Sequence, residues 1–145
     1  MSIKATIPNA RTSEPATTNE IRDAEALLGV NFPEPLRNLY LECDGFREPK
    51  GNAKYLLSLT EEDFIGSLVN TTRWLWNDRE YWRSTAINPA EFIFFGYSSA
   101  DEIWGVRIEA PHKVIQYHHS QGDEVTHLDE DILGVFRSDF QEYED

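Results

Sequence analysis

Apolar positions repeat at helical spacing through the first half of the chain. A capping-box pattern opens at Thr17, and Gly29 stands where a left-handed helix cap is expected. A second helix is predicted after Pro33, and a third is predicted to start at Thr60, before three acids, and to continue past Trp74. The apolar positions of the first two helices are Ile21, Ala24, Leu27 and Leu28, then Leu36, Leu39, Tyr40 and Cys43.

The pattern changes after Pro89, where short runs rich in β-formers are separated by turn residues. These runs are 92–95, 103–106 and 114–117, and 54–57 is a further short strand. A last helix carries Ile132, Val135, Phe136 and Phe140 on one face. Helices, then an antiparallel meander, then a helix predict an α+β domain with helices on one side of the sheet. The residues predicted inside are Leu28, Leu36, Leu39, Phe94, Ile103, Val106, Ile115, Val135 and Phe136.

Composition is that of one self-supporting domain. The chain has 145 residues without an internal repeat, and residues 1–16 read as a loose leader before a domain at 17–145. Its 8 Phe, 6 Tyr and 4 Trp supply a core. Cys43 is the single cysteine, which excludes an internal disulfide and predicts a buried, inert thiol. The start of the sequence carries no secretory signal and no run long enough to span a bilayer, so we expect a cytoplasmic protein.

The net charge of −13 narrows the range of partners. Such a surface repels phosphate backbones and anionic membranes, so neither nucleic acid nor membrane binding is expected. It attracts a cationic protein and speeds the encounter. A role in solubility alone explains the same charge, and both interpretations stay open.

Acidic residues are concentrated near the end of the chain. Residues 121–145 hold nine acids against one base, Arg137. Asp129, Glu130 and Asp131 precede the last helix, where acids stabilise the positive helix end. That role does not explain Asp123 and Glu124, so the segment also fits a docking surface for a cationic partner, with Asp123, Glu124, Asp129 and Glu130 as candidate contacts.

No residue pattern in the sequence predicts catalysis. His118 and His119 are adjacent, so on a strand they point to opposite faces, and no zinc-type spacing joins them to other ligands. Nucleophile-elbow and phosphate-loop motifs are absent. Asp101 and Glu102 beside Trp104 would suit a glycosidase, but such neighbours arise by chance in so acidic a chain. We therefore expect no enzyme, catalytic residue, metal or cofactor.

Four aromatic residues are candidate anchors for a protein partner. The run from Trp74 to Trp82 holds more rings than one helical face can bury, so Trp76 and Trp82 are expected to reach the surface. Tyr97 and Trp104, in the strand region, are the other two candidates.

Three segments in order resemble the SMI1/KNR4 family, also called the SUKH superfamily. The resemblance extends roughly from Ile21 to Phe140. The first segment comprises Ile21, Glu25, Leu28-Gly29, Phe32-Pro33, Leu36, Leu39-Tyr40 and Asp44-Gly45-Phe46. The others are Phe94-Phe95-Gly96-Tyr97-Ser98 with Asp101-Glu102-Ile103-Trp104, and Val114-Ile115 with His118-His119 and the helix at Leu133–Phe136.

This resemblance implies a fold and a kind of function. The implied fold is a single α+β domain with a mixed, mostly antiparallel sheet flanked by helices. Many bacterial members of the family are similar to immunity proteins, which bind a polymorphic toxin, often a nuclease. Fungal members resemble scaffolds of cell-wall signalling. We expect a non-enzymatic protein-binding domain, an immunity protein with a cognate, basic toxin. The alternative is a regulatory or scaffold protein without a toxin partner.

Overall fold

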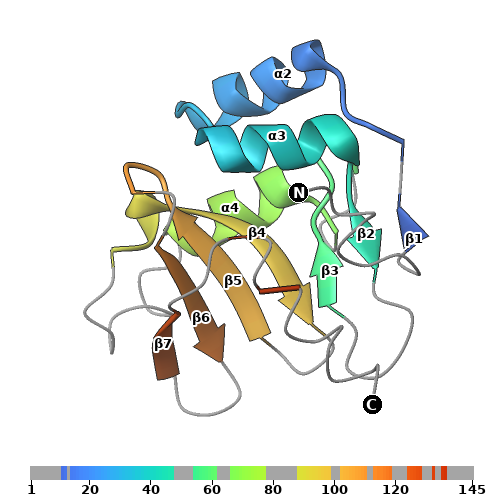
Figure 1. Cartoon of the computed structure of the whole chain (residues 1–145). Helices are drawn as coiled ribbons and strands as arrows, with labels where there is room; N and C mark the ends of the chain where they lie inside the picture. Colours follow the sequence, from blue (N-terminus) through green and yellow to red (C-terminus); the bar gives the residue numbers. More distant parts are fainter. Residues whose placement is uncertain are drawn as a thin grey trace.

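The computed structural model describes residues 11–12, 14–47, 54–61, 66–77, 88–98, 102–110, 113–118, 124–128, 132 and 135–136. In these ranges seven strands form one sheet in which neighbours in sequence are neighbours in space (Figure 1). All ladders between the strands are antiparallel, and the parallel pairing described is one isolated bridge, Ser58 to Ser67. The α+β class and the mostly antiparallel sheet are therefore confirmed.

The first helix, α2 (Thr18–Leu28), starts and ends as the sequence predicts. Thr17 and Glu20 form the reciprocal capping box, and Gly29 adopts the left-handed conformation at φ 74°. Ile21, Ala24 and Leu28 are buried, but Leu27 is 54% exposed. Leu27 lies about 100° around the helix from Leu28, which takes it off the buried stripe. Its predicted place on the apolar face is therefore wrong.

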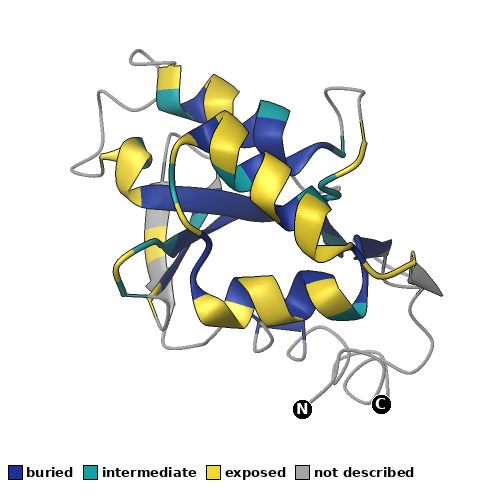
Figure 2. Ribbon diagram, turned by 90° about the horizontal axis from the view of Figure 1, so that it is seen from above, coloured by how far each residue is buried: buried dark blue, intermediate teal, exposed yellow. Residues whose placement is uncertain are grey.

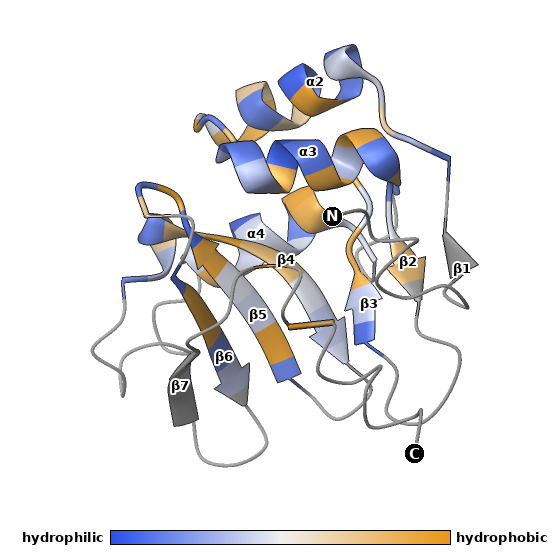
Figure 3. Cartoon of the chain, viewed as in Figure 1, coloured by the Kyte–Doolittle hydropathy of each residue, from blue (hydrophilic) through white to orange (hydrophobic). Residues whose placement is uncertain are grey.

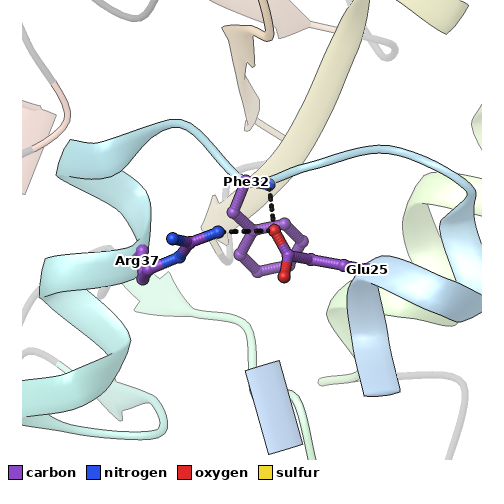
Figure 4. Close-up of polar contacts among 3 residues, drawn as sticks. All are labelled: Glu25, Phe32 and Arg37. Atoms are coloured by element: carbon purple, nitrogen blue, oxygen red, sulfur yellow. Dashed lines mark hydrogen bonds and ion pairs between the residues drawn. The ribbon is translucent and has the colours of Figure 1, made fainter. Parts of the chain in front are cut away.

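Helix α3 (Glu34–Glu42) is fixed to α2 by one carboxylate. Glu25 Oε2 accepts the backbone N–H of Phe32 at 2.7 Å and the guanidinium of Arg37 at 2.8 Å (Figure 4). The connecting turn is therefore held from both sides. Both helices alternate hydrophilic and hydrophobic residues (Figure 3), as expected where only one face is buried. Seen from above, exposed residues follow their outer surfaces (Figure 2).

Helix α4 (Leu68–Asn77) begins later than the sequence predicts. Thr60 does not cap it, because the Thr60 hydroxyl donates to Asp44 in a preceding turn. Gly66 follows with φ 98°, and Ser67 caps the helix by accepting the N–H of Asn70 at 3.1 Å. The acids after Thr60 suggested an earlier start, but tertiary hydrogen bonds to Asp44 decide the local structure.

The strands are β1 (Arg11–Thr12), β2 (Phe46–Arg47), β3 (Lys54–Leu56), β4 (Phe92–Ser98), β5 (Glu102–Arg107), β6 (Val114–His118) and β7 (Glu124–Leu128). All four predicted strands are present. Strand β4 is longer than the predicted run 92–95, because it continues through Ser98 past a register shift between Phe94 and Gly96. A short 3-10 helix at Pro89–Glu91, capped by Asn88, leads into β4.

Residues of the predicted leader belong to the folded domain. Arg11 and Thr12 pair with β2. Glu14 accepts the N–H of Asp44 at 2.9 Å, and Ala16 donates to the carbonyl of Tyr40 at 2.9 Å. In this described part of the predicted leader, residues 11–12, 14 and 16 therefore bond to the domain through their backbone.

Side chains of helix α4 form hydrogen bonds with the part of the β4 edge that does not pair with β3. The hydroxyl of Thr72 accepts the N–H of Phe94 at 3.1 Å and donates to its carbonyl at 3.3 Å. The Trp76 indole donates to the carbonyl of Phe92 at 2.8 Å. Side chains of α4 thus replace a missing strand, which satisfies the sheet edge.

Helical residues cover both faces of the sheet, not one as expected from the order of elements. On the face we call the α4 face, Leu75 of α4 clusters with Phe92, Phe94, Ile115 and Tyr117. On the opposite face, Val135 and Phe136 cluster with Ile93, Trp104, Val106 and Val114, among others. The buried Lys54 contributes by donating to the carbonyl of Val135. Eight of the nine predicted core residues are buried, and Ile103 is only partly so. Phe140 lies outside the described residues.

Candidate partner-binding site

The structure describes three of the four predicted aromatic anchors with their side chains: Trp76, Tyr97 and Trp104. Of the predicted acidic contacts it describes Glu124, through its backbone only, as the first residue of β7 paired with His118. The remaining predicted contacts, Trp82, Asp123, Asp129 and Glu130, lie outside the described residues. Those four residues, and the side chain of Glu124, stay predictions.

Trp104, expected as a surface anchor, is instead a core residue. Its exposed fraction is 0%. The indole N–H donates to Gln116 Oε1 at 3.1 Å, and the ammonium of Lys54 lies 4.9 Å from the ring centroid. A partner could not reach this ring without opening the sheet, so Trp104 contributes to stability. The prediction for Trp104 was wrong because a strand side chain can point to either face of the sheet, and the sequence did not show which face Trp104 takes.

Trp76 is partly buried, and its polar group is already used. The indole N–H bonds the carbonyl of Phe92 at the sheet edge. The ring packs against both hydrophobic clusters. A partner could contact the exposed part of this ring, but it could not use the N–H as a hydrogen-bond donor.

Tyr97 remains accessible and has a stacked neighbour. It lies opposite Tyr55 in the ladder between β3 and β4. The two rings are nearly parallel, with centroids 4.8 Å apart and an interplanar angle of 10°. Both side chains are partly exposed. The sequence named Tyr97 alone, because only the register of β3 against β4 shows that Tyr55 is its neighbour.

The same row across the sheet continues onto β5. Ile103 lies opposite Tyr97 and is also partly exposed. These three side chains share the α4 face because directly paired residues in a sheet point to the same side. Lys54 and Ser98, next to the tyrosines in sequence, are buried on the opposite face. Tyr55, Tyr97 and Ile103 thus form a partly exposed row, and Tyr97 also packs against the larger hydrophobic cluster.

The helices expose three large apolar side chains that the sequence did not single out as contacts. Leu27 on α2, Leu41 on α3 and Trp74 on α4 are exposed by 54%, 43% and 40%. In place of Trp76, Trp74 is the more exposed ring of α4, since Leu75 and not Trp74 faces the sheet. The helical wheel of α4 would have found this if its buried stripe had been centred on Leu68, Thr72 and Leu75.

The buried polar groups of the described residues stabilise turns. Asp44 accepts the N–H of Leu59 at 2.7 Å and the hydroxyls of Ser58 and Thr60. Burial raises the pKa of Tyr40 well above its usual range, and the nearby Asp44 and Cys43 raise it further. Tyr40 donates to the carbonyl of Leu57, so its proton is held in a structural bond. Each of these groups therefore has a structural role in the described part of the chain.

A shallow open groove of about 390 Å³ lies at the end of α2. Its lining includes Arg22, Glu25, Gly29 and Asn31. The Glu25 carboxylate already bonds Phe32 and Arg37. It is therefore not available to bind a ligand in the groove. In the described part of the chain no cluster of three His, Cys, Asp or Glu side chains could hold a metal. None of the four histidine side chains is among the described ones.

Fold and surface together define a small α+β domain with a few exposed or partly exposed aromatic and apolar side chains. The chain belongs to the SMI1/KNR4 family (SUKH-1), whose model matches residues 15–143. This family is one of immunity-protein-like domains, and the resemblance found in the sequence is confirmed. No curated protein sequence matches the chain closely enough to count as a relative. None of the helices described is long and apolar enough to cross a membrane.

Proposed function

We propose that the chain is a non-enzymatic immunity protein that binds and neutralises a cognate, basic, nuclease-type toxin. The observation that carries the proposal is family membership over residues 15–143. The excess of 26 acidic over 13 basic residues supports a basic partner.

The physical basis is competition for a cationic surface. A nuclease must attract phosphate backbones and therefore carries basic residues around its active site. An acidic protein docked there excludes the nucleic acid by occupying the same charge and the same space. Neutralisation of this kind requires affinity and coverage, and it requires no catalytic group on the inhibitor.

A coexpression experiment tests this proposal. A candidate toxin domain, sought in the open reading frame next to the gene for this chain, is expressed alone, with the chain, and with its own active site inactivated. We expect restored growth with the chain. The purified proteins should form a stoichiometric complex whose association slows with added salt.

Two outcomes would contradict the proposal. Toxicity that persists although the folded chain accumulates would exclude neutralisation. A folded chain that forms no complex with either the active or the inactivated toxin would exclude binding. Either result would favour the regulatory or scaffold role, in which the partner is not a toxin.

A further inference from the structure

We draw no further inference here: the strongest candidate, the exposed apolar surface at Leu27 of α2 and Trp74 of α4, where Arg73 joins the two helices by donating to the Leu27 carbonyl, carries no proposal because nothing in the described part of the chain shows what covers it.

Discussion

Phe46 and Phe136 meet edge to face, with ring centroids 4.6 Å apart and planes at 72°. Phe136 makes a second edge contact with Phe95 at 6.0 Å and is fully buried. One ring from the end of the chain therefore joins β2 to the centre of the sheet. It also lies over Gly96, where a Cβ would come within 3.4 Å of the Phe136 ring.

Replacing Phe136 with Ala should lower the free energy of unfolding by about 3–5 kcal/mol, because it leaves a cavity among aromatic rings. Phe136→Leu is the matched control and should cost less, since it keeps most of the volume. Urea denaturation followed by tryptophan fluorescence measures both. An alanine variant as stable as the parent would show that this ring does not fix the end of the chain to the sheet.

Asp44 should be the most sensitive polar position of the described residues. Asp44 is buried, and its carboxylate accepts one backbone N–H and two hydroxyls from a partly buried turn. Asp44→Ala removes these charge-assisted bonds and leaves the partly buried N–H of Leu59 without its acceptor, so we expect a loss of about 2–4 kcal/mol in the free energy of unfolding. Thr60→Val removes one hydroxyl and should cost about 1 kcal/mol. Equal losses in the two variants, measured by urea denaturation, would contradict the central role of Asp44.

Stability should fall at alkaline pH because of Tyr40. Its pKa is raised in the folded chain, chiefly by burial. Below about pH 10, the ordinary tyrosine pKa, the folded and unfolded chains both keep the proton. Above it only the unfolded chain releases the proton, and the free energy of unfolding falls by up to about 1.4 kcal/mol per pH unit.

Tyr40→Phe isolates this effect. The variant loses the bond to the Leu57 carbonyl and should be less stable at neutral pH. Above about pH 10 its free energy of unfolding should also fall less steeply with pH, by the contribution of one proton, because phenylalanine does not ionise. Urea denaturation between about pH 9 and about pH 11 measures the two slopes. Parallel pH dependences would show that Tyr40 ionises as readily when folded.

Two glycines should respond to alanine for different reasons. A Cβ on Gly105 would lie 3.0 Å from two ring carbons of Phe94, so the ring must shift, and Gly105→Ala should cost about 1–3 kcal/mol. Gly29 has open space around it but a φ of +74°, so Gly29→Ala should cost about 1–2 kcal/mol through backbone strain. The NMR signals of the Phe94 ring should move in the first variant only. Movement in both would contradict the local packing argument.

The sequence was most informative where local chemistry decides the structure. The capping box at Thr17, the left-handed Gly29 and the four predicted strands all depend on neighbours along the chain. Local patterns could not predict β1 and β2, because two residues show no alternation and pairing alone makes them strands. They also could not predict the late start of α4. That start depends on hydrogen bonds from Leu59 and Thr60 to Asp44, which is 15 and 16 residues earlier in the chain.

In the candidate site, too, local sequence identifies some residues, and only strand pairing shows how others are placed. Tyr97 was identifiable as a surface aromatic, but Tyr55 becomes its neighbour only through the strand register. Trp104 had an equal claim from sequence, and only its pairing with Gln116 across β5 and β6 places it on the covered face. Successive residues of a strand point to opposite faces of the sheet. Composition therefore cannot tell which aromatic residue of a strand is exposed and which is buried.

The acidic segment should control how fast the partner binds. If the partner is basic, Asp123 and Glu124 lie in the most acidic part of the sequence and should contribute to steering. Long-range attraction acts on the association rate and is screened over about 10 Å at 0.1 M salt. The double charge reversal Asp123→Lys and Glu124→Lys should therefore slow association with the toxin and flatten its dependence on salt, with little change in dissociation. Tyr97→Leu is the complementary variant and should alter dissociation while leaving the salt dependence of association intact. Stopped-flow association and dissociation rates across a salt series measure both effects. An association rate indifferent to salt and to the reversals would make these acids a solubility surface, and the affinity would then depend on short-range contacts alone.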